Sequence, residues 1–445
     1  MLDTWGGSSD QQVGVLIVGA GPVGLCHALW LRQFDVDVLV IDADARSHRE
    51  EWMVLGPDAR RVLNRVGVQS ALDHARVDYD AIVLAPRRGA NDPGGEARGP
   101  AKRPRLLRLP GVGEQAPLSL VNREVLEEVL ERRALEVGVQ VEHAQRLQRV
   151  EIRPTHCEAR IVSTSEGTKV HRATPRDSAR RVLAHWVIGT DGYHSIVRRD
   201  LRAAFRPIAE PRVASIVRVA GRRSVDVEGA VQVSVGENAT HTVWSLGADQ
   251  LLWVTQTTVS EVPTGLEIDD GDSFTFPRPL SRESIRYAGV ADAFLEREAK
   301  HLGIEVDEVL SRHAVHYRPS AADPLGRGRA WTSGAAAQVI APALGLDDNL
   351  GLLEVPDLAL LLGFGAEDGM SGLPTLTPRL YHERRARAQQ HALGAHPLGT
   401  EWPGQHGWSS DDREVVAGAF PFLTRVAVGA RSPSPSARSI EQARS

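Results

Sequence analysis

The apolar and polar positions near the start of the chain predict a strand, a helix and a second strand. Residues 15–18 form a continuous apolar run, and residues 36–41 form a second, largely apolar run that ends on an aspartate. Between the two runs, residues 22–32 carry apolar side chains at the spacing of an amphipathic helix. This order predicts a βαβ unit with parallel strands, the repeating unit of open α/β sheets.

Three glycines between the first strand and the helix predict a phosphate-binding turn. Gly19, Gly21 and Gly24 are spaced as G-x-G-x-x-G, with Pro22 and Val23 between the last two. The first glycine allows a tight turn, the second lets a pyrophosphate approach the backbone, and the third lets the helix pack on the strand. The N-terminus of the helix then offers unpaired N–H groups to the phosphate.

Asp42, which ends the second run, completes a dinucleotide-binding pattern. It follows the glycines by about 20 residues, where a carboxylate accepts hydrogen bonds from an adenosine ribose. A glycine-rich turn in an ordinary βαβ unit is the alternative interpretation. Because both strands, the helix and the acid are in place, we predict that this unit binds a dinucleotide.

The hydrophobic pattern further along the chain predicts more strands, a loop and several helices. Short alternating segments within residues 214–260 are typical of an antiparallel sheet. Residues 87–108 are rich in glycine, proline and arginine, which predicts an exposed loop. Further strands are predicted within 139–141, 150–162 and 181–188. Helices are predicted at 56–67, 122–137, 290–302 and 350–362, the last with a kink or local break at Pro356.

Composition narrows the class of protein without naming a ligand. The 445 residues carry a formal net charge of -5, which gives no general reason to expect nucleic acid or an anionic membrane as a partner. The two cysteines, Cys26 and Cys157, are far apart and predict neither a disulfide framework nor a metal site. We find no pattern of a signal peptide or membrane span, so we expect a cytoplasmic location.

Two later segments make the prediction more specific. Residues 186–198 (WVIGTDGYHSIVR) predict a strand that ends at an acid–glycine turn, Asp191 and Gly192. Residues 328–352 predict a strand, a turn and a proline-marked loop that opens a helix. Together with the glycines, these segments resemble the single-component FAD-dependent aromatic hydroxylases, the p-hydroxybenzoate hydroxylase-like flavin monooxygenases. The resemblance extends from about residue 13 to residue 385.

The resemblance implies FAD as a non-covalent cofactor and NAD(P)H as a co-substrate. It implies that the glycines and Asp42 bind the ADP part and that Arg123 lies near the flavin. It also implies that Asp191 and Gly192 touch FAD and take part in NAD(P)H use. A structural Asx turn is the alternative for Asp191. The residues themselves indicate no catalytic acid or base and no metal ligand.

The third segment departs from the family pattern G-D-A-A-H, three residues, P-x-x-G-Q-G-x-N. Four positions keep the pattern, namely Gly334, Pro342, Gly345 and Asn349. Four positions differ: Ala335 replaces the aspartate expected to bind the ribityl chain, Gln338 the histidine, Leu346 the glutamine, and Asp347 the last glycine. The loop is therefore expected to form, with several flavin contacts missing.

The altered helix start bears on redox chemistry, because in the family this N-terminus lies near flavin N1 and C2=O. Here Asp347 and Asp348 stand at that position. A carboxylate ~5 Å from reduced flavin, at an effective dielectric of ~20, would disfavour reduction by roughly 3 kcal/mol, or roughly 65 mV. The alternative is that one of the two turns outward as a helix N-cap.

We therefore predict an α/β fold with a Rossmann-like FAD-binding domain in three segments, an antiparallel-sheet substrate domain and a helical C-terminal region. The FAD-binding segments are 12–75, 118–200 and 300–365, and the substrate-binding segments are 76–117 and 201–299. Residues 366–430 are assigned to the helical region, and residues 431–445 to a disordered tail.

Three functional hypotheses follow from the resemblance. The first is a monooxygenase that acts on a bulky hydrophobic or aromatic, polyketide-like substrate in bacterial secondary metabolism. The altered third segment favours the second, a non-redox cyclase such as a [4+2] cyclase with FAD as a structural cofactor. The third is a homologue that binds a ligand without turnover, and the intact glycines argue against it.

Overall fold

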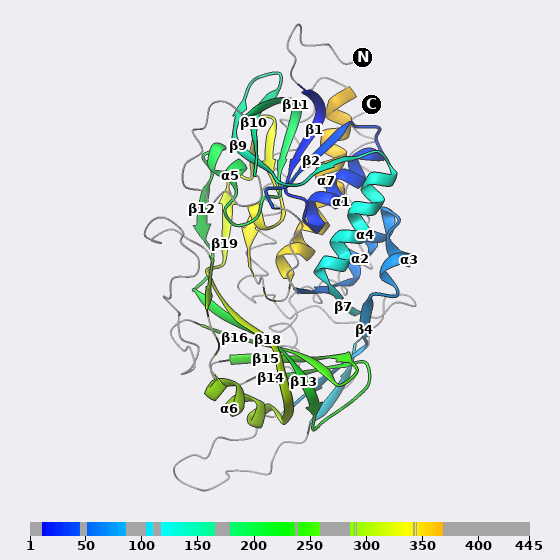
Figure 1. Cartoon of the computed structure of the whole chain (residues 1–445), viewed down its shortest axis with the longest axis vertical. Helices are drawn as coiled ribbons and strands as arrows, with labels where there is room; N and C mark the ends of the chain where they lie inside the picture. The colour runs from blue at the N-terminus through cyan, green and yellow to red at the C-terminus, as the bar shows by residue number, and fades with distance from the viewer. Residues whose placement is uncertain are drawn as a thin grey trace, which may run out of the picture.

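The computed structural model describes residues 11–44, 51–85, 104–109, 117–164, 179–235, 239–258, 285–288, 290, 292–340, 343 and 345–367. These residues form two main sheets that lie at opposite ends of the molecule, joined by smaller sheets (Figure 1). The first sheet carries most of the helices, and the second carries one helix on its outer side.

The first sheet is built around parallel strands in the order β8-β2-β1-β11-β21. Its strands β1 and β2 are the two apolar runs that the sequence pattern predicts. The antiparallel strand β20 and the hairpin of β9 and β10 extend it. The strands of this sheet are β1 (Gln11–Val18), β2 (Val38–Ile41), β8 (Gln140–Glu142), β9 (Gln145–Ile152), β10 (Cys157–Ser163), β11 (Arg180–Gly189), β20 (Gly326–Arg327) and β21 (Ala330–Thr332).

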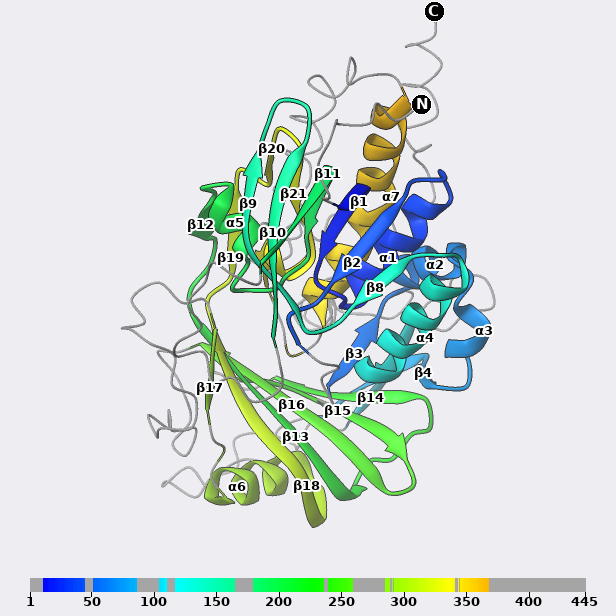
Figure 2. The ribbon, with the colours of Figure 1, turned by 45° about the horizontal axis from the view of Figure 1, so that its top comes forward.

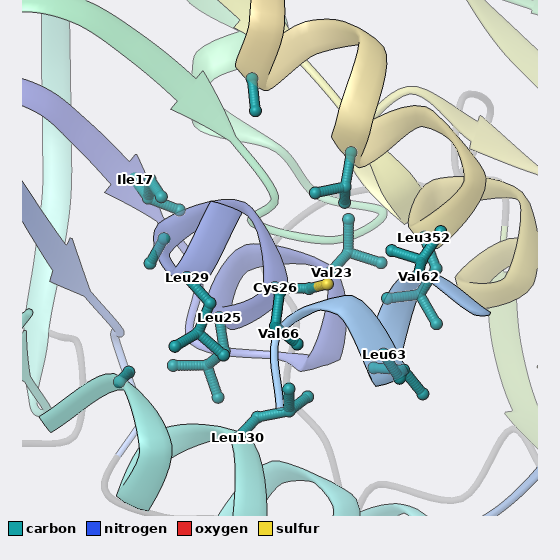
Figure 3. Packing of buried hydrophobic residues seen from close by; sticks show 14 of the residues in the cluster. Ile17, Val23, Leu25, Cys26, Leu29, Val62, Leu63, Val66, Leu130 and Leu352 are labelled. Carbon is teal, nitrogen blue, oxygen red and sulfur yellow. The ribbon is translucent and has the colours of Figure 1, made fainter. Parts of the chain in front are cut away.

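Helices cover one face of this sheet and share a single apolar core. Figure 3 shows Val23, Leu25 and Leu29 of α1 packed among side chains of α2, α4 and α7. Burial of each such side chain stabilises the fold by ~1.5–3 kcal/mol, so this core fixes α1 against α7. The four helices are α1 (Pro22–Arg32), α2 (Pro57–Arg65), α4 (Arg123–Glu136) and α7 (Leu346–Glu367), and the one-turn α3 (Gln69–Leu72) follows α2.

The opposite face of the first sheet packs against β9, β10 and the short helix α5 (Ile196–Asp200). Residues Leu16 and Leu39 point to this side, while their neighbours Ile17 and Val40 point to the helices. Side chains of both faces are apolar, which is typical of a parallel sheet that is covered on both sides.

The second sheet has eight strands in the order β17-β18-β13-β16-β15-β14-β5-β6, and all neighbours except β14 and β5 are antiparallel. Helix α6 (Asp292–Leu302) packs on the face that points away from the first sheet (Figure 2). The strands are β5 (Ala81–Leu84), β6 (Arg105–Arg108), β13 (Arg212–Arg223), β14 (Ala230–Val235), β15 (Ala239–Gly247), β16 (Gln250–Thr258), β17 (Ile285–Ala288) and β18 (Ile304–Tyr317).

Two three-stranded sheets lie between the main sheets. The first pairs β3 and β4 on either side of β7, and the second pairs β12 and β22 on either side of β19. Their strands are β3 (Trp52–Leu55), β4 (Arg76–Tyr79), β7 (Leu118–Asn122), β12 (Ala204–Pro207), β19 (Ser320–Asp323) and β22 (Gln338–Val339).

The structure confirms the predicted helix over 122–137 and its cap, because the Asn122 side chain accepts a hydrogen bond from the Glu124 N–H at 2.9 Å. Three details differ from the sequence-based predictions. Residues 105–108 form β6 on the second sheet, not a loop. Strand β18 lies within residues 300–365, which are predicted to belong to the FAD-binding domain, but it pairs with β13 of the second sheet. Helix α7 starts at residue 346 and continues through Pro356 without a break.

Several predictions concern residues outside the described part of the chain. These are the position of Pro342, the greater part of the predicted loop, the helical region beyond Glu367, and the tail at 431–445.

Candidate functional site

The turn after β1 requires glycine at two positions for steric reasons. Gly19 has a φ of +109°, and a Cβ there would lie 2.4 Å from the carbonyl oxygen of Thr190. A Cβ on Gly24 would lie 2.0 Å from the carbonyl oxygen of Gly19. The Thr190 hydroxyl donates to that same Gly19 carbonyl at 2.9 Å. The two outer glycines therefore bring α1, β1 and the end of β11 into backbone contact.

The middle glycine has a different environment. Gly21 is the N-cap of α1, with no side-chain cap and no acidic residue in the first turn, and Pro22 occupies a first-turn position. Among the described residues, a Cβ on Gly21 would meet the side chains of Arg123, at 3.4 Å from Nη2, and Glu127, at 3.9 Å from Oε1. The positive end of α1 is thus not neutralised by its own side chains, which suits a diphosphate.

Asp42 lies beside this turn, as the sequence predicts. Its Oδ2 accepts a hydrogen bond from the Ala20 N–H at 2.7 Å, and its Oδ1 accepts one from the Asp44 N–H at 2.9 Å. Each carboxylate oxygen can accept a further hydrogen bond. The half-buried side chain therefore orders the turn and keeps the acceptor capacity that a ribose needs.

The acid–glycine turn after β11 has a clear structural role. Asp191 accepts hydrogen bonds from the Ser195 hydroxyl at 2.5 Å and from the N–H groups of Ile196 and Val197 at 2.6 and 3.2 Å. Burial raises the pKa of Asp191, and these hydrogen bonds oppose the shift. The carboxylate thus bonds to residues four to six positions on, at the start of α5, and not to the N–H two residues on that defines an Asx turn, so its structural role is to hold the N-terminus of α5. Gly192 has a φ of +72°, and a Cβ there would meet nothing within 4 Å.

Arg198 joins this turn to the third segment. Its guanidinium donates to the carbonyl oxygen of Tyr193 and, at 2.8 Å, to that of Ala336. Its side chain also lies over the ring of Phe205, with Cζ 4.0 Å from the centroid. Two segments that are far apart in the sequence are therefore fixed against each other by one planar cation.

The third segment keeps its backbone turns. Gly334 has a φ of +58° and packs on Val23 of α1: a Cβ on Gly334 would lie 3.2 Å from a methyl group of Val23. Gly345 has a φ of +61° and is packed on Met53 in the same way. Ala335 is half-buried in the 3-10 turn Gly334–Ala336, and its side chain carries no polar group.

Asn349 ties the start of α7 to the neighbouring chain. Its Oδ1 accepts from the Gly56 N–H at 2.9 Å, and its Nδ2 donates to the carbonyl oxygens of Val54 and, at 3.0 Å, Gly345. Both amide hydrogens are used by the backbone. The described contacts thus give Asn349 a role in shaping the loop.

The two aspartates at the start of α7 both point inward, so the predicted alternative of an outward N-cap is wrong. Asp347 is 1% exposed and accepts hydrogen bonds from the Ile340 N–H at 2.5 Å and from the Tyr193 hydroxyl at 3.1 Å. Asp348 accepts from Nη1 of Arg123 at 2.9 Å. Burial, with the charges of Asp347 and Asp348, raises the pKa of Tyr193, so its phenol stays protonated and donates.

Arg123 is surrounded by three carboxylates. Its Nε lies 2.8 Å from Glu127 Oε1 and 3.7 Å from Glu51 Oε2, in addition to the contact with Asp348. Burial alone would lower the pKa of Arg123, but the three carboxylates outweigh it and raise the pKa. Burial raises the pKa of Asp348 and of Glu127.

Sequence reasoning missed Tyr193, Glu51 and Glu127 as members of this site. Glu127 follows Arg123 by four residues on a helix, a spacing that predicts an ion pair. No local pattern marks Glu51 or Tyr193, because their partners come from other elements. Within the described part of the chain, no group of three or more His, Cys, Asp or Glu residues is arranged to hold a metal ion. No described helix is long and apolar enough to cross a membrane.

A family model described as an FAD binding domain matches residues 12–392. The chain belongs to this family. The predicted resemblance is thereby confirmed at the level of the family, and FAD is the cofactor that the family implies. No curated protein sequence matches the chain significantly.

Solved structures of several FAD-family enzymes have the same fold. The substrate-free rebeccamycin biosynthetic enzyme RebC is 21% identical, with a TM-score of 0.63 over 95% of this chain and 75% of that chain. The flavin-dependent monooxygenase PieE, in complex with FAD and substrate, is 18% identical, with a TM-score of 0.62 over 94% and 72%. The Diels-Alderase PyrE3 of pyrroindomycin biosynthesis is 19% identical, with a TM-score of 0.60 over 84% and 71%. These similarities confirm the predicted fold class.

The residues of the first segment fit the ADP part of FAD. A side chain at Gly21 would fill the space between α1 and Arg123, and α1 has no side-chain cap of its own. Asp42 keeps the acceptors for a ribose. The third segment fits less closely, because Ala335 offers no hydrogen-bond acceptor from its side chain to a ribityl chain.

Proposed function

We propose that the protein is an FAD-dependent monooxygenase that inserts one oxygen atom into a bulky hydrophobic or aromatic, polyketide-like substrate. The observation that carries the proposal is the intact diphosphate turn, with Asp42 beside it, in a chain of the FAD-binding family. PieE, which shares the fold, is described as a flavin-dependent monooxygenase. Bound FAD would supply the electron-transfer and oxygen-activating chemistry, with NAD(P)H as the reductant.

The chain's own residues would bind FAD, orient it and exclude water from the site. The N-terminus of α1 and Nη2 of Arg123 would hold the diphosphate, and Asp42 would hold the ribose. We place Asp191 and Gly192 at the edge of the cofactor site, where their turn is fixed by Arg198 through Tyr193 and Ala336. We assign no side chain as a catalytic acid or base.

The substrate would lie between the second sheet and the FAD-binding domain. A buried apolar cluster there combines Trp244 and Leu252 of the second sheet with Ile340 of the third segment. Trp52 and Ile216 are partly buried and pack against this cluster. Because the members of the cluster are fully packed, the surface left for a hydrophobic ring system would be that of the partly buried side chains at its edge. We propose a small hydrophobic molecule as the partner, in the cytoplasm, with neither nucleic acid nor membrane involved.

The test begins with the purified holoprotein under anaerobic conditions. Addition of NADH or NADPH, with and without candidate aromatic polyketides, is expected to bleach the yellow absorbance of the oxidised flavin. Readmission of oxygen is then expected to yield one hydroxylated product per NAD(P)H consumed. A flavin that stays oxidised while product forms would overturn the monooxygenase proposal.

A non-redox cyclase is the second candidate, and a specific feature favours it. Asp347 and Asp348 are both buried at the N-terminus of α7. In the family, the corresponding helix N-terminus stabilises the negative charge of the reduced flavin, and two aspartates there would oppose this effect. PyrE3, which shares the fold, is described as a Diels-Alderase. A cyclase would form its product without NAD(P)H and without oxygen, so product analysis under argon separates the two candidates directly.

A further inference from the structure

We propose that Asp348 is a positioning residue for FAD: its ion pair with Arg123 holds the guanidinium so that Nη2 faces the diphosphate turn at Gly21. The inference rests on FAD binding, which both proposed reactions share, and not on which of them takes place. It assigns a role to an aspartate that stands in the altered third segment.

The three edges of the guanidinium have three different neighbours. Nε donates to Glu127 at 2.8 Å, and Nη1 donates to Asp348 at 2.9 Å. The remaining Nη2 lies 3.4 Å from the point where a Cβ on Gly21 would stand. Because the guanidinium is planar and rigid, holding two edges fixes the direction of the third.

The turn at Gly21 is the place where an additional cation is useful. Helix α1 has no side-chain cap and no acid in its first turn, so its N–H groups are available to an anion. A charge-assisted contact from Nη2 would add to those groups. Glu127 and Glu51 both lie at the Nε edge, at 2.8 and 3.7 Å, so together they hold one edge of the guanidinium and do not fix the direction of Nη2.

Asp348 anchors a second edge of the guanidinium, at Nη1. It comes from α7, is separated from Arg123 by 225 residues, and its side chain is 11% exposed. Asn349, the next residue, fixes the start of α7 to β3 and to the N-cap of α2 through Val54 and Gly56. The anchor is therefore rigid, and the position of α7 is transmitted to the diphosphate turn through Arg123.

Asp348 has two opposing effects on an anionic ligand, and these can be separated. Its hydrogen bond orients Arg123, which favours the diphosphate, while its negative charge repels it. Asp348→Ala removes both effects. Asp348→Asn removes the charge but leaves Oδ1 as an acceptor for Nη1.

The experiment measures the Kd of FAD for apoprotein by quenching of flavin fluorescence. Asp348→Ala is expected to weaken binding about tenfold, and Asp348→Asn to stay within about threefold of wild type or to bind more tightly. ADP, as a competitor, is expected to lose affinity by the same factor as FAD. Glu136→Ala is the matched control, because Glu136 makes an exposed pair with Arg133 on the same helix.

A double-mutant cycle tests whether Asp348 acts through Arg123. In the Arg123→Ala background, Asp348→Ala is expected to have no further effect on the Kd. If Asp348→Ala does not fold, Arg123→Lys takes its place, because a lysine cannot hold both carboxylates and still present a third edge. Unchanged FAD affinity in Arg123→Lys or Asp348→Ala, a loss with Asp348→Ala that persists without Arg123, or a loss for FAD but not for ADP would each overturn the inference. The reaction proposed above is tested separately, by turnover.

Discussion

The glycine turn after β1 and the start of α7 serve one site but are built in different ways. In the turn, backbone atoms decide the structure, since any Cβ on Gly24 would collide with the Gly19 carbonyl. At the start of α7, side chains decide it: Asp347, Asp348 and Asn349 each bond to a different part of the chain. The first region therefore tolerates no side chain at Gly19 or Gly24, whereas the second region tolerates a substitution when the residues that bond to it change as well.

The largest effect is expected from Gly24→Ala. The new Cβ would lie 2.0 Å from the Gly19 carbonyl oxygen and 2.6 Å from Thr190 Oγ1, so the turn must open. We expect the apoprotein to lose ~3 kcal/mol of unfolding free energy, at the upper end of overpacking effects, and FAD binding to fall below detection. Urea denaturation and flavin content after purification measure the two effects.

Gly21→Ala is the matched control for that change. Its Cβ would make only ordinary contacts with Arg123 and Glu127, at 3.4 and 3.9 Å. The apoprotein is expected to remain as stable as wild type to within ~1 kcal/mol, while FAD affinity falls at least about tenfold because the methyl group takes diphosphate space. Equal destabilisation of the two apoproteins would contradict the steric distinction between the two glycines.

A gain is expected from Ala335→Asp, which restores the carboxylate that the family pattern has at this position. Ala335 is half-buried, so an aspartate there is not forced into an apolar core. One or two hydrogen bonds to the ribityl hydroxyls are expected to contribute roughly 1–3 kcal/mol to FAD binding. Isothermal titration of FAD into apoprotein measures this, with Ala335→Leu as a variant that adds bulk without an acceptor. Unchanged or weaker binding would show that the loop is rebuilt around a different contact.

These differences explain how far the sequence predicts the molecule. The glycine spacing, the two apolar runs and the Asn122 cap depend on neighbours within a few residues, and the structure agrees with each of them. The placement of β18 depends on pairing with β13, about 90 residues earlier, so the assignment of residues 300–365 to the FAD-binding domain is wrong for this strand. The sequence pattern does not predict strand β6 either, because its partner β5 is separated from it by a long glycine-rich segment.

The candidate site shows the same division. The resemblance implies that Gly21 and Asp42 bind the ADP part and that Arg123 lies near the flavin, whereas the structure brings Arg123 next to Gly21 at the diphosphate turn. The direction of the aspartate side chains at α7 does not follow from any local pattern. Aspartate is an ordinary N-cap residue, and only the distant partners Tyr193 and Arg123 explain why both side chains turn inward.

The smallest effect concerns the redox consequence of that inward direction. Asp347→Asn keeps an acceptor for the Ile340 N–H, and its amide nitrogen can donate to the Tyr193 oxygen, so the local packing is preserved. If the Asp347 charge acts on the flavin, its removal is expected to raise the reduction potential by about 30 to 60 mV, following Coulomb's law at an effective dielectric of ~20. Asp357→Asn is the control, because it removes one charge from the same helix ~15 Å further along. Spectroelectrochemical titration of both variants measures the shift, and equal potentials in the two would mean that the buried carboxylate does not tune the flavin. A shift of the expected size in Asp347→Asn alone, together with faster reduction by NAD(P)H, would show that the start of α7 restrains redox chemistry which the glycine turn makes possible.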